Sequence, residues 1–301
     1  MNEPYHIPAL LNEAVEGLDV KLDGTYIDVT FGGGGHSRAI MQKLGKKGTL
    51  VGFDQDADAL ANKIDSPNFI FVHGNFRYIR NFLRFHDITK VDGILADLGV
   101  SFHHFDSPQR GFSFRNDTYL DMRMNTSADK DACSIVNNYS PEDLKYIFKI
   151  YGELTNAPKI AGAIVKARSV KPIETTGQLI EVISPFIDPK REKKDLAKAF
   201  QAIRIAVNNE LGALEQLLKA SVDLLNKGGR LAIISYHSLE DRMIKNFMKT
   251  GNIEGKVDTD IYGNNFSPFK LLTSKPILPS EEEIERNPRS RSAKLRIAER
   301  R

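Results

Sequence analysis

The residues best suited to chemistry in this sequence are acids and glycines that end short apolar runs. Asp54 and Asp97 each follow a run of β-branched and aromatic residues, and Gly32 to Gly35 follow another. Glycine lets the main chain approach a ligand closely because it has no Cβ atom. A carboxylate accepts hydrogen bonds from hydroxyl groups and attracts cations. These residue types predict a site for a small ligand that carries hydroxyl groups or positive charge.

The glycine run departs from the fingerprint of a dinucleotide site. In that fingerprint, G-x-G-x-x-G, the third glycine would fall at residue 37 if the first is Gly32, but residue 37 is Ser37. Asp28 precedes the glycines, where a carboxylate repels a pyrophosphate but can hold a cationic ligand. S-adenosylmethionine has an ammonium and a sulfonium group and no phosphate, so we predict this cofactor rather than NAD. For the turn taken alone, a tight connection without a ligand is the alternative.

Four predicted strands place these residues at one edge of a sheet. Each strand precedes a helical pattern, which indicates parallel strands with right-handed crossovers. The predicted strands are residues 26–31, 49–53, 69–72 and 91–96. Ligands of such sheets bind beyond the carboxyl ends of the strands. Asn75 and Phe76 follow the third strand and are placed to hydrogen-bond or stack an adenine. A single acid after a strand is commonly a helix cap, but polar residues at four strand ends favour a ligand site.

The alternation of strands and helices stops near residue 103 and resumes near residue 211. Helical patterns occupy residues 156–168, 176–184 and 195–209, and the later strands are predicted at 231–236, 270–274 and 294–298, the last two as an antiparallel pair. We therefore predict an α/β fold with a doubly wound sheet and an inserted helical domain. Residues 1–103 and 211–301 would form the sheet domain, and residues 104–210 the inserted domain that binds the substrate.

Composition places the chain among soluble globular proteins. It has 301 residues, of which 41% are hydrophobic, and no apolar run approaches the ~18 residues of a membrane span. The start of the sequence shows no signal-peptide pattern. One cysteine, Cys133, cannot form an internal disulfide, and seven scattered histidines show no zinc spacing. We predict a cytoplasmic protein without a metal site and without a membrane partner.

Positive charge is concentrated in the C-terminal tail. Residues 286–301 hold seven Arg and Lys against one Glu, whereas the net charge of the whole chain is only +3. A basic tail favours a polyanionic partner. A solvated strand or helix end is an equally good explanation of the tail considered alone.

Several segments, in order over nearly the whole chain, resemble one protein family. They are Phe31-Gly-Gly-Gly-Gly-His-Ser37, Asp97-Leu-Gly-Val-Ser101, Arg110-Gly-Phe-Ser-Phe114, Leu120-Asp-Met-Arg-Met124, Tyr151-Gly-Glu153, Phe200-Gln-Ala-Ile-Arg204, Ser235-Tyr-His-Ser-Leu-Glu-Asp-Arg242 and Asn287-Pro-Arg289. This set resembles the MraW family, the bacterial ribosomal small-subunit RNA (cytosine-N(4))-methyltransferases. The resemblance implies a Rossmann-like class I methyltransferase sheet that uses S-adenosylmethionine. It also implies a cytosine in the decoding region of 16S ribosomal RNA as the target, with that RNA or the small subunit as partner, and it leaves a homodimer open.

The resemblance also implies which residues bind the cofactor. Carried over position by position, they are Gly34, Gly35, His36, Asp54, Phe76, Asp97 and His104. The sequence departs from the family at Phe102-His103-His104, where the family often has Ser-Pro-Gln, so His104 replaces a glutamine. It departs again at Ala197-Lys198-Ala199, where the family has Thr-Arg-Thr. We further predict that Asp97 is catalytic, as the acceptor for a hydrogen of the target amine.

Aromatic and basic residues suggest where RNA binds. Phe105, Phe112, Phe114 and Tyr119 alternate with Arg110, Arg115 and Arg123. Such a mixture suits single-stranded RNA, but a long loop that packs its own aromatic side chains gives the same pattern. A base-stacking ring is predicted at Phe102, Phe105 or Phe112. The inserted domain has further basic residues, namely Lys159, Lys166, Arg168, Lys171, Lys190, Arg191, Lys193, Lys194 and Lys198.

Other functions remain open on the residues alone. A methyltransferase of the same fold that acts on DNA or a small molecule is one alternative, and a non-catalytic RNA-binding scaffold is another. An oxidoreductase with this sheet is disfavoured by Ser37 and Asp28. His237, close in sequence to Glu240 and Asp241, is compatible with a catalytic dyad, although we predict that it orients the following helix.

Overall fold

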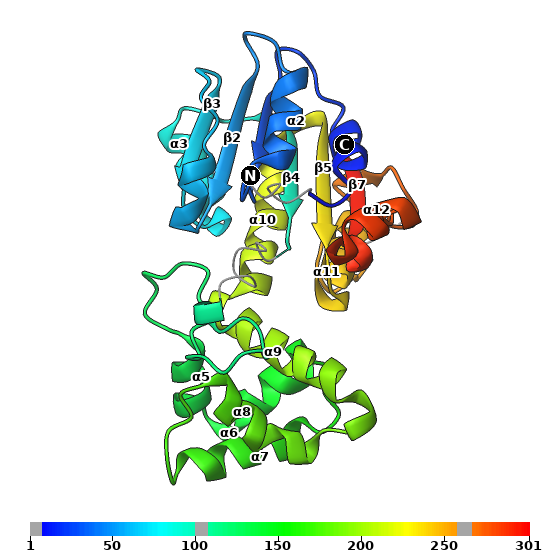
Figure 1. Ribbon diagram of the computed structural model, residues 1–301. Coiled ribbons are helices and arrows are strands. Elements are labelled where there is room, and N and C mark those ends of the chain that lie inside the picture. Colours follow the sequence, from blue (N-terminus) through cyan, green and yellow to red (C-terminus); the bar gives the residue numbers. More distant parts are fainter. Residues whose placement is uncertain (1–7, 100–107, 258–266) are drawn as a thin grey trace. The chain divides into compact units, whose positions relative to one another are not determined.

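The computed structural model describes residues 8–99, 108–257 and 267–301 (Figure 1). The chain forms two compact units, one of Met1–Gly99 with Leu211–Arg301 and the other of Val100–Glu210. We call the first the sheet unit and the second the helical unit. The sequence predicted the boundaries after residues 103 and 210, and the structure divides the units after Gly99 and Glu210.

The sheet unit contains a seven-stranded sheet with the order β3-β2-β1-β4-β5-β7-β6. Its strands are β1 (Thr25–Asp28), β2 (Thr49–Asp54), β3 (Phe69–His73), β4 (Val91–Asp97), β5 (Leu225–Ser235), β6 (Phe269–Leu271) and β7 (Lys294–Arg300). The first five strands pair in parallel, and β7 pairs antiparallel with both β5 and β6. The predicted α/β fold and the predicted antiparallel pair at its end are confirmed.

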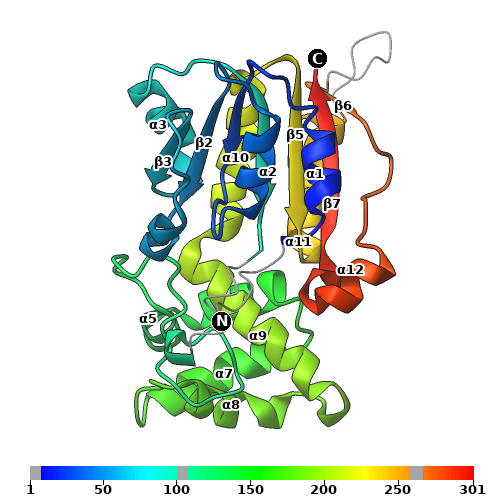
Figure 2. The same cartoon turned by 45° about the horizontal axis from the view of Figure 1, so that its top comes forward.

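Helices cover both faces of this sheet (Figure 2). They are α1 (Leu11–Gly17), α2 (Gly35–Lys43), α3 (Ile79–Phe85), α10 (Glu210–Leu224), α11 (Ser238–Thr250) and α12 (Glu281–Arg286). Successive strand residues point to opposite faces: Ile27 packs in a core cluster with residues of α3, α10 and α11, whereas Tyr26 packs in another with residues of α1 and α2. Two layers of buried apolar side chains therefore hold the strand ends in place.

Short 3-10 segments replace some of the predicted α-helix. The helical pattern that follows the second predicted strand is the 3-10 segment η1 (Ala57–Asn62), where the Asp56 side chain accepts a hydrogen bond from the Asp58 amide at 3.1 Å. Further 3-10 segments are η2 (Phe76–Tyr78) and η7 (Pro288–Ser292). A run this short gains little from α-helical hydrogen bonds, so a side-chain cap is enough to favour the tighter turn.

The helical unit has its own hydrophobic core. Its elements are η3 (Pro108–Arg110), α5 (Ala132–Asn138), α6 (Pro141–Tyr146), the π-helical segment η4 (Ile147–Tyr151), α7 (Ala157–Arg168), α8 (Thr176–Ile183), η5 (Ser184–Phe186), η6 (Pro189–Arg191) and α9 (Glu192–Asn208). Phe148, Ile164 and Phe200, from three of these elements, are buried in one cluster that contains no residue of the sheet unit. Within the described residues of both units, no helix has the length and apolar character that a membrane span requires.

Candidate functional site

The glycine turn joins β1 to α2. Gly32 and Gly34 have positive φ angles of 50° and 74°, a region that side chains with a Cβ atom rarely adopt. A Cβ atom on Gly34 would lie 2.8 Å from Arg38 Nη1, and one on Gly35 would lie 2.6 Å from Pro8 Cγ. Among the described residues, a Cβ atom on Gly32 would meet only Thr30 O, at 4.0 Å. Gly34 and Gly35 are therefore required by packing within the protein, whereas Gly32 leaves an open face for a ligand.

Asp28 braces this turn from inside. Its side chain accepts hydrogen bonds from Ser37 Oγ at 2.7 Å and from the Thr30 amide at 3.1 Å, and the residue is only 1% exposed. The hypothesis that Asp28 holds a cationic ligand is therefore wrong, because its carboxylate is closed off from any ligand. Its negative charge instead orders the turn through the hydrogen bonds of Ser37 and Thr30.

Asp54 connects the end of β2 to the glycine turn. Its Oδ2 atom accepts from the Gly32 amide at 2.7 Å, and its Oδ1 atom accepts from the Asp56 amide at 2.9 Å. A carboxylate oxygen can accept more than one hydrogen bond, so these two main-chain bonds are compatible with ligand hydroxyls at the same carboxylate. The structure thus brings the predicted acid and the open glycine together.

The end of β3 presents Phe76 rather than Asn75. Asn75 Nδ2 donates to Gln55 Oε1 at 2.8 Å, and its Oδ1 atom accepts from the Arg77 amide at 2.9 Å, which caps η2. The amide of Asn75 is therefore engaged within the protein. Phe76 is half-buried at the start of η2, with its ring packed against the core.

His36 turns its ring inward, toward Asp97. The residue is 4% exposed, with Nε2 at 3.2 Å from Ala9 O and Nδ1 at 3.9 Å from Asp97 Oδ2. A carbonyl oxygen can only accept, so Nε2 carries the hydrogen of this bond. The buried ring leaves the main chain of His36, rather than its side chain, as the part that can face a ligand.

Asp97 ends β4 in a largely enclosed position. Its side chain is 18% exposed and its amide donates to Thr30 Oγ1 at 2.7 Å. Burial raises the pKa of Asp97, although the nearby His36 ring and a hydrogen bond from the Tyr236 side chain act in the opposite direction. The pKa of Tyr236 is raised well above its usual value by burial and by Asp97. The phenol therefore stays protonated and donates its hydrogen to Asp97.

Tyr236 is a site residue that the sequence reasoning did not identify. It follows β5, and Asp97 pairs in register with Ile234 of that strand, which brings Tyr236 beside Asp97. A Cβ atom on Gly99 would lie 2.8 Å from the Tyr236 ring, so Gly99 makes room for it. The signal was present, because Tyr236 lies in a segment that resembles the family and is the last residue of a predicted strand.

His237 and Glu240 hold the chain that follows Tyr236. The His237 side chain accepts from the Glu240 amide at 3.5 Å and is the N-cap of α11. Glu240 is 3% exposed, and its Oε2 atom accepts from the Tyr236 amide at 3.1 Å. The prediction that His237 orients the next helix is confirmed, because His237 caps its N-terminus.

Part of the predicted RNA-contacting stretch lies outside the described residues. His104, with Phe102 and Phe105, falls in residues 100–107. Phe112 is 5% exposed within the core of the helical unit, so the prediction that its ring stacks on a base is wrong. The ring of Phe114 lies 5.7 Å from that of Phe200, also in this core. These two aromatic side chains pack the helical unit.

The arginines among these aromatic residues are also used internally. Arg110 Nη2 donates to Arg123 O at 2.6 Å, and Arg123 Nε pairs with Asp121 Oδ1 at 2.6 Å. Arg168 donates to Val136 O at 2.8 Å and Tyr139 O at 2.7 Å. These three guanidinium groups tie the chain of the helical unit together.

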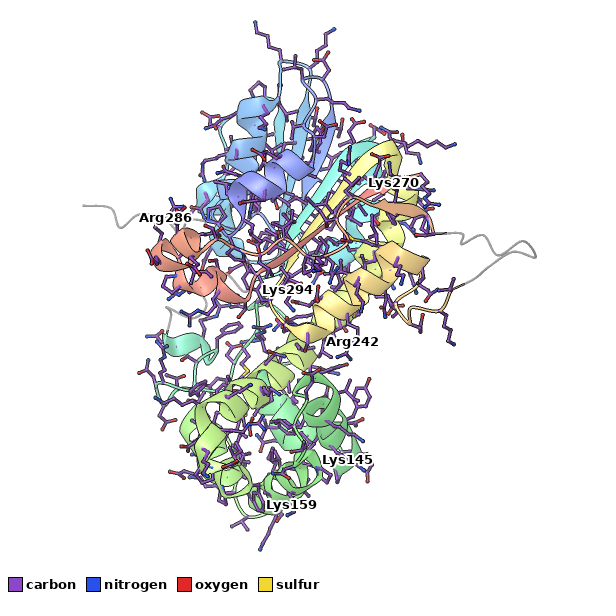
Figure 3. All side chains as sticks on the ribbon, turned by 90° about the vertical axis from the view of Figure 1, so that its right-hand side faces the viewer. Lys145, Lys159, Arg242, Lys270, Arg286 and Lys294 are labelled. Carbon is purple, nitrogen blue, oxygen red and sulfur yellow. The ribbon has the colours of Figure 1, made fainter. Side chains whose placement is uncertain are left out.

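Other basic residues of the helical unit face solvent. Of the basic residues singled out in this unit from the sequence, the exposed ones are Lys159, Lys166, Lys171, Lys190, Arg191, Lys193 and Lys194. Figure 3 shows Lys145 and Lys159 extending from the surface of this unit. Lys198 is half-buried, with Nζ at 3.5 Å from Glu153 O.

Much of the charge in the C-terminal tail is paired inside the sheet unit. Arg296 of β7 is 8% exposed, and its Nε donates to Asp241 Oδ1 at 2.6 Å. Lys294 Nζ lies 3.6 Å from Asp241 Oδ2, and Arg300 donates to Val222 O at 2.8 Å. The alternation of basic and apolar residues in the tail is thus that of a strand in the sheet.

Comparisons with known proteins identify relatives over nearly the whole chain. A family model described as the MraW methylase family matches residues 3–301. The chain is 60% identical over 295 residues to ribosomal RNA small subunit methyltransferase H of Bacteroides thetaiotaomicron, covering 98% of this chain and 97% of that protein. It is 54% identical to the protein of the same name from Flavobacterium johnsoniae, again over 98% and 97%.

A solved structure is similar at a much lower level. The crystal structure of an rRNA methylase from Streptococcus thermophilus covers 100% of this chain and 98% of its own, with 13% identity and a TM-score of 0.39. A structural similarity this low supports no conclusion about function.

Proposed function

Because this chain belongs to the MraW methylase family, we propose that it transfers a methyl group from S-adenosylmethionine to the exocyclic amine of a cytosine in 16S ribosomal RNA. The observation that supports this best is the position of Asp97 at the end of β4, where Tyr236 donates to its mostly buried carboxylate and its main-chain amide donates to Thr30 Oγ1. The substrate places the reaction in the cytoplasm, where bacterial ribosomal subunits are found.

The glycine turn and the neighbouring strand ends fit the cofactor. Asp54 lies beside the glycine turn as a carboxylate suited to the ribose hydroxyls, Gly32 leaves an open face, and Phe76 offers a half-buried ring for the adenine. The main chain at Gly34, Gly35 and His36 completes the turn. S-adenosylmethionine supplies an electrophilic methyl group on a positively charged sulfur.

Asp97 serves the methyl acceptor. The lone pair of a cytosine amine is delocalised into the ring, and an in-line displacement requires close alignment of this nitrogen with the methyl carbon. A carboxylate that accepts one amine hydrogen favours the tetrahedral nitrogen of the transition state. Its raised pKa makes Asp97 a better acceptor for the proton that leaves this nitrogen as the N–C bond forms.

Tyr236 positions Asp97 for this role. The phenol donates to the carboxylate, so it restricts rotation of the Asp97 side chain and leaves other carboxylate lone pairs for the amine. A cytosine in paired RNA must also be flipped out of its stack to reach this edge of the sheet. The exposed lysines of the helical unit are suited to hold the surrounding phosphates.

A radiolabelled methyl-transfer assay tests this function. The whole protein is given small-subunit ribosomal RNA, either free or in assembled particles, and the product is digested to nucleosides. The expected product is N4-methylcytidine from at least one of the two RNA forms. Transfer to DNA or to a small amine but not to RNA would favour the alternative methyltransferase. A protein that binds RNA but neither transfers a methyl group nor binds the cofactor would be a non-catalytic scaffold.

A further inference from the structure

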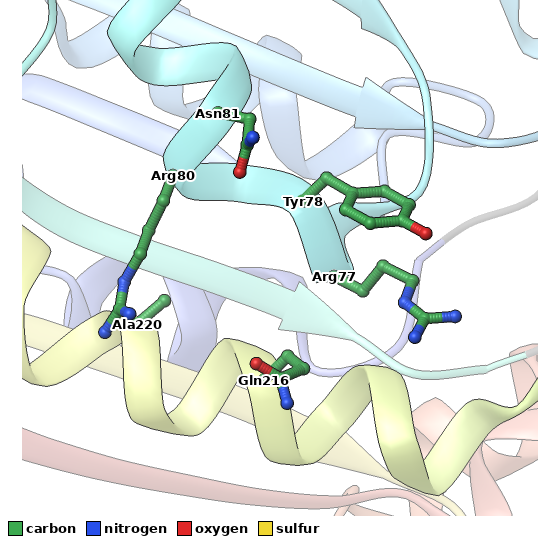
Figure 4. Close-up of a pocket in the computed structure, with 6 residues that line it drawn as sticks. All are labelled: Arg77, Tyr78, Arg80, Asn81, Gln216 and Ala220. Carbon is green, nitrogen blue, oxygen red and sulfur yellow. The ribbon is translucent and has the colours of Figure 1, made fainter.

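A groove in the sheet unit lies outside the site described above. It has a volume of about 320 Å³ and is lined by Arg77, Tyr78, Arg80, Asn81, Gln216 and Ala220 (Figure 4). One wall is the segment formed by η2 and α3, and the other is α10, which packs on the same face of the sheet. None of these side chains has a role in the chemistry proposed for Asp97.

The two arginines of the groove differ in how they are used. Arg80 pairs with Asp223 and donates to Lys219 O at 3.1 Å, so it fastens α3 to α10. Arg77 is exposed, and its side chain pairs with no carboxylate among the described residues. The guanidinium carbon of Arg77 lies 5.1 Å from the centre of the Tyr78 ring. The groove therefore presents one uncompensated cation, and this cation already stacks on an aromatic ring.

The remaining side chains of the groove suit a nucleotide. Tyr78 is 52% exposed, and Figure 4 shows it extending beside Arg77, with Gln216 across from them on α10. Asn81 and Gln216 are exposed amides on opposite walls, and each can both donate and accept a hydrogen bond. An aromatic ring, a guanidinium group and amides together are the groups that bind splayed RNA bases and their phosphates.

The place of the groove in the fold also favours RNA. Arg77 directly follows Phe76, at the carboxyl end of β3, and Asp97 ends the parallel strand β4. The carboxyl ends of parallel strands share one edge of a sheet, so RNA that delivers a cytosine to this edge has neighbouring nucleotides near η2. We propose that this groove binds a nucleotide adjacent in the RNA to the target region, with its base on Tyr78 and its phosphate at Arg77. This inference rests on the proposed function.

The test measures RNA binding by the full chain, independently of methyl transfer. The dissociation constant for a mixed-sequence single-stranded RNA oligonucleotide and for small-subunit ribosomal RNA is determined at several salt concentrations. We expect Tyr78→Ala to weaken binding by about tenfold, the loss typical of one stacked base. Arg77→Gln should reduce the salt slope, which is the slope of the logarithm of the binding constant against the logarithm of the salt concentration. Its magnitude should fall by about 0.7, the value for one phosphate of a single strand.

Two matched variants serve as controls. Tyr78→Phe keeps the ring and should bind RNA like the unmodified protein. Arg84→Ala removes an exposed arginine from the last turn of α3, outside the groove, and should leave affinity within about twofold. Cofactor affinity and melting temperature, measured for every variant, should stay constant because the groove side chains are exposed.

Three results would overturn the assignment. The first is equal RNA binding by Tyr78→Ala, Arg77→Gln and Arg84→Ala. The second is an equally large loss with Tyr78→Phe, which would exclude stacking. The third is that Tyr78→Ala and Arg77→Gln bind free RNA normally but bind assembled small subunits more weakly. This result would identify a ribosomal protein as the partner of the groove. A protein that binds RNA through the groove but transfers no methyl group would instead contradict only the proposed function.

Discussion

At the scale of single residues, Asp97 shows the conflict between stability and chemistry. A carboxylate in a largely enclosed position is costly to ionise, and burial raises the pKa of this group despite the opposing effects of His36 and Tyr236. The same burial makes Asp97 a stronger proton acceptor than an exposed aspartate. In the proposed mechanism, the protein gives up some stability at neutral pH in exchange for a group suited to the transfer.

The pH dependence of folding reports this cost. A carboxyl whose pKa is raised in the folded state stabilises the fold while it is protonated, and this contribution is lost as the pH rises through the folded pKa. Asp97→Asn cannot ionise, so its melting temperature relative to the unmodified protein should increase from pH 4 to pH 8. Thermal unfolding at the two pH values measures this difference. A relative melting temperature that falls over this range would show that the charged carboxylate is favoured by its surroundings.

A second residue-scale prediction concerns Tyr236. Tyr236→Phe removes the hydrogen bond to Asp97 while keeping the ring that packs against Gly99. Turnover should fall by about tenfold, as for the loss of a hydrogen bond to a charged group. Because that bond lowers the pKa of Asp97, the acid limb of the rate profile should also shift to higher pH.

The control for Tyr236 is Tyr146→Phe, which changes a tyrosine that is 53% exposed on the helical unit. Its turnover and pH profile should match those of the unmodified protein. An unchanged pH profile in Tyr236→Phe, even with reduced turnover, would argue that Tyr236 has only a packing role.

At the scale of elements, the glycine turn depends on the strand beside it. Asp54 accepts a hydrogen bond from the Gly32 amide, so Asp54→Ala removes the proposed ribose acceptor and also an anchor of the turn. Cofactor binding should weaken by about 1.5–3 kcal/mol, which calorimetry measures directly. Asp58→Ala, a change of an exposed neighbouring acid, is the control. Equal cofactor affinity in the two variants would show that Asp54 does not bind the cofactor.

The ion pair between α11 and β7 is a second element-scale case. Burial favours the neutral form of Asp241, but Arg296 and then Lys294 outweigh this effect, and the pKa of Asp241 is lowered overall. Stability from this carboxylate is therefore present at neutral pH and is lost as the pH falls through its folded pKa.

Asp241→Asn leaves the buried Arg296 without its partner, so we expect a loss of about 2–4 kcal/mol at pH 7. Chemical denaturation should show that the difference shrinks toward pH 3. Glu215→Gln, at a solvent-exposed pair with Lys219, should cost less than about 0.5 kcal/mol. A loss at Asp241 that is the same at both pH values would contradict the electrostatic explanation.

The elements show how far sequence reasoning reaches. The strands were predictable because Tyr26, Ile27 and their counterparts form short apolar runs that end in glycine or acid. The direction of polar side chains was not: Asp28 faces inward to Ser37, and Arg296 faces Asp241, a residue distant in the sequence. The segment around Phe112 has the composition of an RNA-binding loop, but tertiary packing buries the Phe112 side chain. Contacts between distant segments leave little local trace in a sequence.

At the scale of the whole molecule, the chain combines two units with separate cores. The sheet unit holds Asp54, Asp97 and Tyr236, and the helical unit exposes a group of basic residues at the start of α9. We propose that the helical unit contributes RNA affinity and that the sheet unit contributes the chemistry. Each unit can then be altered with little effect on the other.

Neutralising lysines of η6 and of the start of α9 tests this division. A variant with Lys190, Lys193 and Lys194 changed to Gln should bind small-subunit RNA more weakly. The slope of the logarithm of its binding constant against the logarithm of the salt concentration should decrease in magnitude by up to about 0.7 for each phosphate that the protein no longer binds. Cofactor affinity should not change. Changing Glu142, Glu174 and Glu181, three exposed acids of the same unit, to Gln is the control for altered charge and should not weaken binding. Persistent RNA affinity and salt slope in the lysine variant would show that these lysines are only a solvated surface.

The most direct test of the central claim is turnover by Asp97→Asn at saturating cofactor and RNA, with the product identified as a nucleoside. An amide keeps the size of the side chain but is a much weaker proton acceptor, so we predict that turnover falls by about 100-fold or more. Cofactor affinity, measured by calorimetry on the same preparation, should remain near that of the unmodified protein. Normal turnover at saturation, with only cofactor affinity reduced, would contradict the account and leave Asp97 as a binding residue.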